Sequence, residues 1–222
     1  MLIIGVVAPP AGGKSTVAAM LESLGATWIN ADSIAHQILQ RPDLRARVVA
    51  AFGPEIVNDD GAINRKSLGK FVFGDDSEKV AARRTLEEIV HPAVRAEISR
   101  QLIQAARSLA PGVVLDIPLL FEGGWANQCD EVWFIDTAAK IQSDEATRRG
   151  WTMENLNRRQ SSQLSLVEKR RLSTRVIPNH ETLASLRSRI EKIWTDCVSP
   201  TAIAGVQFGP PNHCHPEPPG DS

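Results

Sequence analysis

Residues 2–16 read LIIGVVAPPAGGKST, and VAAMLESLG follows as residues 17–25. The opening LIIGVV is apolar and rich in β-branched residues, which predicts a short strand that is buried on both faces. Apolar residues then recur at helical spacing from Val17 to Leu24, and Gly25 is placed to end that helix. ATWIN, residues 26–30, predicts a second short strand. A strand, a glycine-bearing loop, a helix and a strand form the setting in which phosphate-binding loops occur.

The loop between this strand and helix is APPAGGKST, residues 8–16. It partly matches the phosphate-binding pattern G-x-x-x-x-G-K-[ST], because Gly13, Lys14 and Ser15 stand at the expected positions. Ala8 replaces the first glycine of the pattern, and two prolines follow it. Ala8 fits there with a negative φ, whereas a positive φ would cost about 1–2 kcal/mol.

The half of the loop that can bind an anion is intact. Successive backbone N–H groups at the start of a helix bind phosphate, a lysine adds positive charge, and a hydroxyl holds magnesium. Pro9 and Pro10 carry no N–H group, but they lie in the half that shapes the turn. The alternative is a proline-bent turn with an exposed lysine. The expected phosphate donors are Ala11, Gly12, Gly13, Lys14, Ser15 and Thr16.

The composition narrows the class of protein. The 222 residues carry 25 basic and 26 acidic side chains, a formal charge of -1, so no overall basic field favours nucleic acid. No apolar segment reaches the roughly 20 residues that span a membrane. Three cysteines at wide spacings suit a reducing compartment better than a disulfide framework. We expect a cytoplasmic protein, monomeric or a small homo-oligomer, that binds neither nucleic acid nor membranes.

Strand-like and helical segments alternate along much of the chain, which predicts an α/β fold with a parallel sheet between two layers of helices. The further strands expected are residues 113–117, 131–136 and 175–179. Residues 1–35 and 90–198 would form this three-layer core.

The segments outside the sheet have different compositions. Residues 36–89 read as a helical insertion between two strands of the sheet, with NDDG at 58–61 as a turn. We expect the helical pattern to break at Pro92, giving separate helices on either side of it. Residues 140–172 are helical and rich in arginine, which suggests a lid. Residues 199–222 are rich in proline and glycine and read as a disordered tail.

Acidic residues stand at the ends of two of the predicted strands, at the edge where open α/β sheets bind ligands. Asp32 could accept a proton from a hydroxyl substrate, or it could be a helix N-cap. Asp116 begins DIPLLFE at 116–122, where an acid can position magnesium through water, and Glu122 could face the same cleft. The alternative for Asp116 is a capped strand end.

Arginines dominate the predicted lid. Arg148 and Arg159 lie on either side of WTMEN, residues 151–155. Two helices carrying them could fold over bound phosphates and bring guanidinium groups to a transferred group. The alternative is a solvated helix face, which is the usual setting of a charge run.

Six motifs in this order resemble those of the dephospho-CoA kinase family, whose members phosphorylate the ribose 3′-hydroxyl of dephospho-coenzyme A with ATP. The family pattern is roughly IG-[LV]-TGGIGSGKST, DAD-x-[IL]-A, HP-x-[IV]-R, D-[IV]-PLLFE, Q-x-[PS]-x-x-E-K-R and VI-x-N. The corresponding stretches here are IGVVAPPAGGKST at 4–16, NADSIA at 30–35, HPAVR at 91–95, DIPLLFE at 116–122, QLSLVEKR at 163–170 and VIPN at 176–179.

The resemblance implies ATP and dephospho-CoA as substrates and Mg²⁺ as the metal ion. It implies that Asp32 is the general base, that Lys14 polarises the ATP phosphates, and that Ser15 ligates Mg²⁺ with Asp116 behind a water. Arg148 and Arg159 would be lid arginines that take part in catalysis.

The resemblance also implies residues for the two ends of the substrates. Asn179 would lie near the adenine of ATP, and the insertion at 36–89 would bind the acceptor. The residues implied for the acceptor pocket are Asp32, His91, Arg95, Asp116, Leu119 and Glu122.

The chain departs from the family pattern in the first half of the loop, where residues 8–11 replace most of TGGIG, and at Asn30, which replaces the first acid of DAD. Neither change removes Lys14, Ser15 or Asp32. Two other functions stay open from the sequence: another phosphate-loop kinase for a small molecule or nucleoside monophosphate, and a catalytically impaired nucleotide-binding protein.

Overall fold

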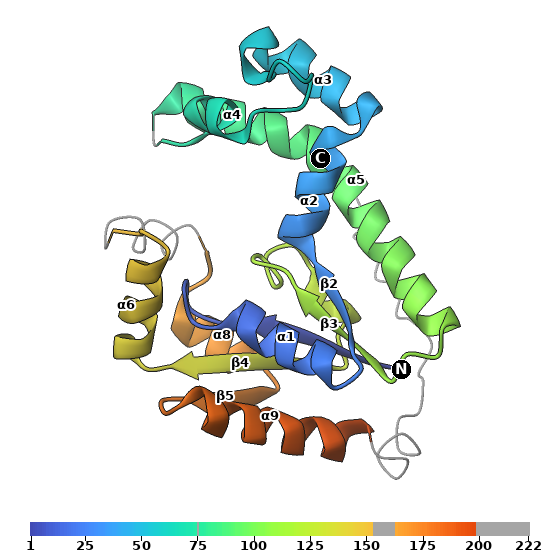
Figure 1. The fold of residues 1–222 in the computed structure, drawn as a ribbon, viewed down its shortest axis with the longest axis vertical. Helices are drawn as coiled ribbons and strands as arrows, with labels where there is room; N and C mark the ends of the chain where they lie inside the picture. The colour runs from blue at the N-terminus through green and yellow to red at the C-terminus, as the bar shows by residue number, and fades with distance from the viewer. Residues whose placement is uncertain (75, 153–162, 199–222) are drawn as a thin grey trace, which may run out of the picture.

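A computed structural model describes residues 1–74, 76–152 and 163–198 (Figure 1). Its centre is a five-stranded sheet in the order β2-β3-β1-β4-β5, and every neighbouring pair is parallel. This confirms the expected α/β class. The strands are β1 (Leu2–Val7), β2 (Thr27–Asn30), β3 (Gly112–Asp116), β4 (Glu131–Thr137) and β5 (Arg175–Asn179).

Helices cover both faces of the sheet, as the alternating pattern predicted. Side chains of β1 alternate between two cores: Ile4 and Val6 pack with α1 and α9, whereas Val7 packs in the core of the opposite face. That opposite core also receives α5 and α8. The bounds are α1 (Lys14–Ser23), α5 (Ser77–Arg107), α8 (Leu166–Leu172) and α9 (Leu183–Val198).

The chain after β2 forms helices that stand beyond the end of the sheet (Figure 1). Their inner side chains join the core on the α5 face, and Phe52 and Phe71 meet edge to face at 6.2 Å. Residues 58–61 form the predicted turn, closed by the N–H of Gly61 donating to the carbonyl of Asn58. The elements are α2 (Ala31–Gln40), α3 (Pro42–Phe52), a 3₁₀ turn (Pro54–Ile56) and α4 (Arg65–Val72).

One expected boundary is wrong. The chain does not break at Pro92, because α5 continues from Ser77 to Arg107. A proline inside a helix removes a single backbone hydrogen bond and crowds the carbonyl four residues earlier. Pro92 and Glu88 are both exposed, so water can reach that carbonyl. Packing of α5 on β2 and β3 at one end and on α2 and α4 at the other outweighs the local preference.

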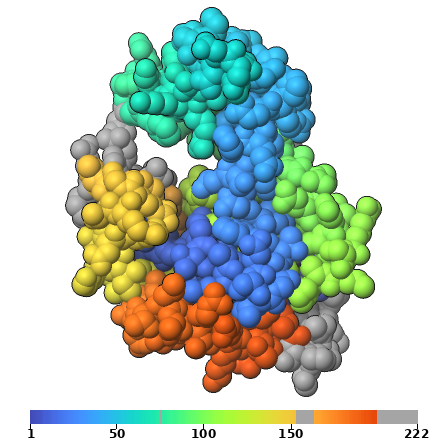
Figure 2. All heavy atoms as spheres, viewed as in Figure 1, coloured from blue at the N-terminus to red at the C-terminus, as the bar shows by residue number. Residues whose placement is uncertain are grey.

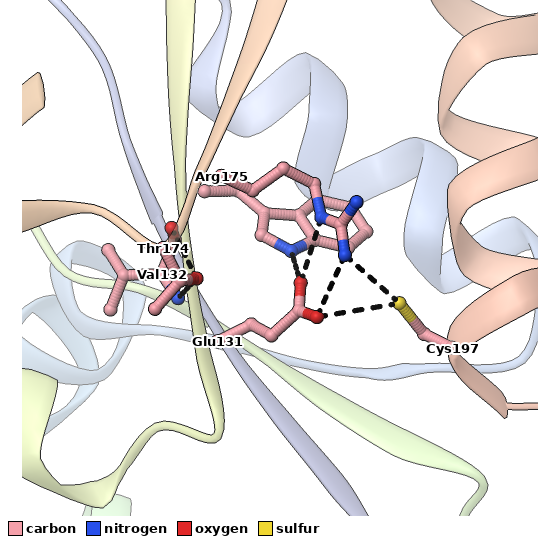
Figure 3. A network of polar contacts seen from close by, with 6 residues as sticks. Glu131, Val132, Thr174, Arg175 and Cys197 are labelled. Atoms are coloured by element: carbon pink, nitrogen blue, oxygen red, sulfur yellow. Dashed lines mark hydrogen bonds and ion pairs between the residues drawn. The ribbon is translucent and has the colours of Figure 1, made fainter. Parts of the chain in front are cut away.

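A polar cluster joins the far edge of the sheet to the last helix (Figure 3). The carboxylate of Glu131 accepts two hydrogen bonds of 3.0 Å from Arg175 on β5 and one of 2.5 Å from the indole of Trp133. Cys197 of α9 lies 3.8 Å from the same carboxylate. Burial raises the pKa of Glu131, but hydrogen bonds from Arg175 and Trp133 more than offset it, and the net pKa lies below the ordinary value.

We expect Glu131→Gln to lower the free energy of unfolding by about 1–2 kcal/mol at neutral pH, since the amide cannot accept both charged hydrogen bonds. A lowered folded-state pKa stabilises the fold fully above the unfolded value of 4.5, and this contribution is lost as the pH falls below it. The difference between wild type and variant should therefore shrink in acid.

Urea unfolding at pH 7 and at about pH 3.5 measures this difference. Glu191→Gln is the control, because Glu191 is an exposed carboxylate of α9 whose removal should change stability by less than about 0.5 kcal/mol. If the free energies of unfolding of wild type and Glu131→Gln differed equally at both pH values, the lowered pKa of Glu131 would be contradicted.

Candidate active site

The two prolines of the loop build a tight turn. The N–H of Gly12 donates to the carbonyl of Pro9 at 2.8 Å, and Ala11 has a φ of 57°. A proline at the second position and a left-handed residue at the third are features of a type II turn. A Cβ on Gly12 would lie 2.7 Å from the Pro9 carbonyl oxygen, so only glycine fits there. The residue of the loop's first half that has a positive φ is therefore Ala11 and not Ala8.

Side chains from outside the loop donate hydrogen bonds to the carbonyl groups of this turn. Thr137 donates to the carbonyl of Gly12 at 2.7 Å, and Gln142 donates to that of Pro10 at 2.9 Å. Asn179, predicted for the adenine side, is buried and donates to Thr137 at 3.3 Å. Asn179 therefore supports the loop indirectly, through its hydrogen bond to Thr137.

The helix that follows the loop begins without a side-chain cap. Gly13 is its N-cap in the left-handed region, with φ 83°, and no side chain there accepts a hydrogen bond. The first N–H groups of a helix have no partner inside the helix and carry its partial positive charge. Alternation of left-handed residues in the loop forms a concave nest of N–H groups suited to an anion. This geometry favours a phosphate site over an ordinary turn.

Asp116 is the centre of the site. Its side chain is 2% exposed, and Lys14 Nζ lies 2.6 Å from Oδ1. Its other oxygen, Oδ2, accepts hydrogen bonds from Ser15 Oγ at 3.0 Å and Asn30 Nδ2 at 3.1 Å. The register of the sheet explains the last contact, since Asn30 and Asp116 are paired neighbours on β2 and β3. The carboxylate therefore joins the loop to the ends of two strands.

The side chain of Asn30 also caps α2. Its Oδ1 accepts the N–H of Ser33 at 2.8 Å, so Asn30 is the N-cap of the helix. The cap alternative for Asp32 is thereby excluded, because Asp32 lies in the first turn and is exposed. Asp32 borders the same pocket as the loop.

This pocket collects groups from three parts of the chain. The loop, Val7 at the end of β1 and Asp32 form one side, and Pro118 follows β3. The rest of the lining comes from the region predicted as a lid: Arg149, Trp151, Gln163 and Lys169. Figure 2 shows the molecule hollowed above the blue N-terminal residues, between the cyan and teal helices after β2 and the yellow α6 segment (Ala139–Arg148).

The oxygens at the loop suit a magnesium ion. Ser15 Oγ and the Asp116 carboxylate lie 3.0 Å apart, and hard oxygen donors of this kind are those Mg²⁺ prefers. Among the described residues, no group of three or more His, Cys, Asp or Glu side chains could hold a metal ion. Ser15 and Asp116 thus offer two oxygen donors, and Mg²⁺ sites in nucleotide-binding proteins commonly add substrate phosphates and water.

The predicted lid arginines occupy different positions. Arg148 is 77% exposed and pairs with Glu145, away from the pocket lining. The next residue, Arg149, lines the pocket and lies over the ring of Trp151 at 5.4 Å. Trp151 in turn packs against a small cluster made of Ala11 of the loop and Ala146 of α6. Arg159 falls outside the described residues, as does the predicted tail at 199–222.

The residues predicted for the acceptor lie beside the loop after β3. Arg95 donates to the carbonyl of Gly123 and lies 5.3 Å from the centre of the Trp125 ring. His91 is exposed one helical turn earlier on α5, and Leu119 is 39% exposed. A role for these side chains in acceptor binding stays a prediction.

Glu122, also predicted for the acceptor, contacts the segment before α8. Its Oε1 accepts the N–H of Leu164 at 2.8 Å and lies 3.7 Å from Lys169 Nζ. No pocket role was predicted from the sequence for Lys169, Gln163, Arg149 or Trp151. Two signals were present: Gln163 and Lys169 both belong to the motif QLSLVEKR at 163–170, and Lys169 follows Leu166 by three residues, which places it on the inner face of that helix.

A phosphate loop after the first strand of a parallel sheet, with a buried acid next to its lysine and serine, is the arrangement of phosphate-loop nucleotide-binding proteins, a class that includes many kinases. Comparison with known proteins agrees. The dephospho-CoA kinase family model matches residues 2–185, and the chain belongs to this family.

Its relatives match over most of their length. A dephospho-CoA kinase of Symbiobacterium thermophilum is 44% identical, with 87% of this chain and 80% of the relative covered. One of Rhodopirellula baltica is 41% identical, with 85% and 88% covered. The solved dephospho-CoA kinase from Campylobacter jejuni gives a TM-score of 0.68 at 28% identity, over 90% of this chain and 98% of that one.

We expect Pro10→Gly to weaken ATP binding about two- to fivefold. Proline at this position fixes the turn before ATP arrives, and freeing it costs about 0.4–1 kcal/mol of ordering on binding. Isothermal calorimetry measures the affinity. Pro42→Gly is the control, since Pro42 begins α3, outside the pocket lining. Equal or tighter ATP binding by Pro10→Gly would show that the proline does not preorganise the loop.

Proposed function

We propose that this chain transfers the γ-phosphoryl group of ATP to the ribose 3′-hydroxyl of dephospho-CoA, giving CoA and ADP as the last step of CoA synthesis. The observation that carries the proposal is the meeting of Asp32 with the phosphate loop at one pocket, in a chain whose relatives are dephospho-CoA kinases. A phosphate site and a carboxylate at one pocket are what transfer to an alcohol needs.

The loop would bind the nucleotide phosphates. The N–H groups from Ala11 to Thr16 would surround the anion. Lys14 would exchange its ion pair with Asp116 for an ion pair of similar length with a phosphate oxygen. Ser15 and Asp116 would hold Mg²⁺, the latter through water. The ion, when bound, neutralises charge on the phosphates. Asp116 keeps both loop side chains aimed at the pocket.

Asp32 would act on the acceptor. Its place in the first turn of α2 leaves the carboxylate exposed at the pocket, where it can accept the proton of the 3′-hydroxyl as the new bond forms. The hydrogen bonds of Asn30 fix the start of α2 and so hold Asp32 at a set distance from the loop.

The remaining parts have supporting roles in this proposal. The helices of residues 36–89 would bind the rest of dephospho-CoA, together with His91, Arg95 and Leu119. The lid at 140–172 would close over the phosphates, bringing in Arg149 beside the predicted Arg148 and Arg159 and excluding water. Between them, the described residues form no helix long and apolar enough to cross a bilayer. A cytoplasmic location and a monomeric or small homo-oligomeric state remain predictions.

The two other functions considered are less well supported. A catalytically impaired protein has no use for Asp32 held at the pocket in addition to the phosphate loop. A kinase for a different small molecule shares the geometry but lacks the support of the relatives, which are dephospho-CoA kinases. Assays of the purified chain with ATP and dephospho-CoA, AMP or adenosine as acceptor separate these functions. Formation of CoA with dephospho-CoA alone supports the proposal.

We expect Asp32→Asn to lower kcat by about 10²–10⁴-fold while ATP affinity changes little, because the amide keeps the shape but cannot take the proton. A coupled assay of ADP release, with calorimetry for ATP, measures both quantities. Glu191→Gln removes one carboxylate from α9, outside the pocket lining, and should retain wild-type turnover. Near-normal turnover of Asp32→Asn would rule out the base assignment.

A further inference from the structure

Lys169 is a buried lysine that the proposed mechanism does not use. Its side chain is 2% exposed, yet it lines the same pocket as the phosphate loop. Removing an ammonium group from water costs several kcal/mol unless partners compensate for the lost hydration. The contacts of Lys169 therefore indicate the role of its positive charge.

Two side chains hold the ammonium group in place. Gln163 Oε1 accepts a hydrogen bond from Lys169 Nζ at 2.6 Å. Glu122 Oε1 lies 3.7 Å from Nζ, an ion pair longer than a hydrogen bond, and also accepts the N–H of Leu164. An ammonium group has three donors. These contacts fix the position of Nζ and leave it donor capacity for a ligand in the pocket.

The charge of Lys169 adds to that of Lys14. Each lysine forms an ion pair with a carboxylate: Lys14 with Asp116, and Lys169 with Glu122. Burial lowers the pKa of Lys169, Glu122 raises it, and the nearby charge of Lys14 lowers it again, with a net lowering. Two cations at one pocket repel each other, and an anion between them removes that repulsion.

A purely structural role does not explain this arrangement. The hydrogen bond from Leu164 to Glu122 already ties the segment before α8 to the loop after β3. An apolar side chain would fill the space at lower desolvation cost, since buried ion pairs are often no more stabilising than packed hydrophobic residues. A cation kept at the pocket wall points to a ligand with negative charge.

We propose that Lys169 is a second phosphate-binding residue, which donates to the outer phosphate oxygens of a bound nucleoside triphosphate beside Lys14. Gln163 and Glu122 are positioning residues that hold its ammonium group. The inference rests on the proposed function for the identity of the nucleotide. It assigns the segment 163–169 to the phosphate site, where it forms a wall of the pocket facing the loop.

The test is calorimetry of ATP and of AMP, each with Mg²⁺, on the full chain. Lys169→Met should weaken ATP binding about 10–100-fold, as expected for a lost charged hydrogen bond, and leave AMP binding unchanged because AMP lacks the outer phosphates. A merely structural role would weaken both nucleotides alike. Lys169→Gln keeps a donor for Glu122 and serves if the Met variant does not fold; it should show the same selective loss.

Lys192→Met is the matched control. Lys192 is an exposed lysine of α9, outside the pocket lining and the lid, and the variant makes the same change of side chain. It should bind ATP as the wild type does. ATP affinity of Lys169→Met and Lys169→Gln equal to that of Lys192→Met would overturn the proposal. Wild-type protein that binds ATP but forms no CoA would contradict only the proposed function.

Discussion

The buried carboxylate of Asp116 is the constraint on which the site depends. A charge with 2% exposure is costly to bury unless it is paired and hydrogen-bonded. Its partners come from the loop, through Lys14 and Ser15, and from the end of β2, through Asn30. Satisfying one carboxylate thus sets the directions of the loop lysine and serine. Because Asn30 also caps α2, the same network fixes where Asp32 stands.

Much of this could be predicted from the sequence. The strands are short and apolar and lie between clear helical or turn signals, so β1 and β5 match the expected bounds and the other three strands are within one residue of them. The position of both acids at one edge of the sheet was predictable as well, because parallel strands end at the same edge. Asp116 is the last residue of β3, and Asp32 follows β2. The phosphate loop was recognisable in spite of its substitutions, since the N–H donors are backbone groups.

The features that were not predicted depend on tertiary contacts, which the spacing of residues along the sequence does not determine. Pro92 lies inside α5 because packing at both ends of that helix outweighs the local preference. Arg149, and not Arg148, reaches the pocket because the phase of the last turn of α6 decides which arginine faces inward. Lys169 was hidden within a basic run, where exposure is the usual outcome. Strain at Ala11, and not at Ala8, follows from the turn that Pro10 imposes, which the loop pattern alone does not show.

The central claim is that the charge of Asp116 organises a magnesium-dependent phosphate site. The most direct measurement is ATP affinity with and without Mg²⁺ for wild type and Asp116→Asn, with circular dichroism to confirm the fold. The account predicts that Mg²⁺ strengthens ATP binding to the wild type and that most of this gain is lost in the variant, whose amide cannot hold the hydrated ion as a carboxylate does. An equal gain from Mg²⁺ in a folded Asp116→Asn variant would contradict it.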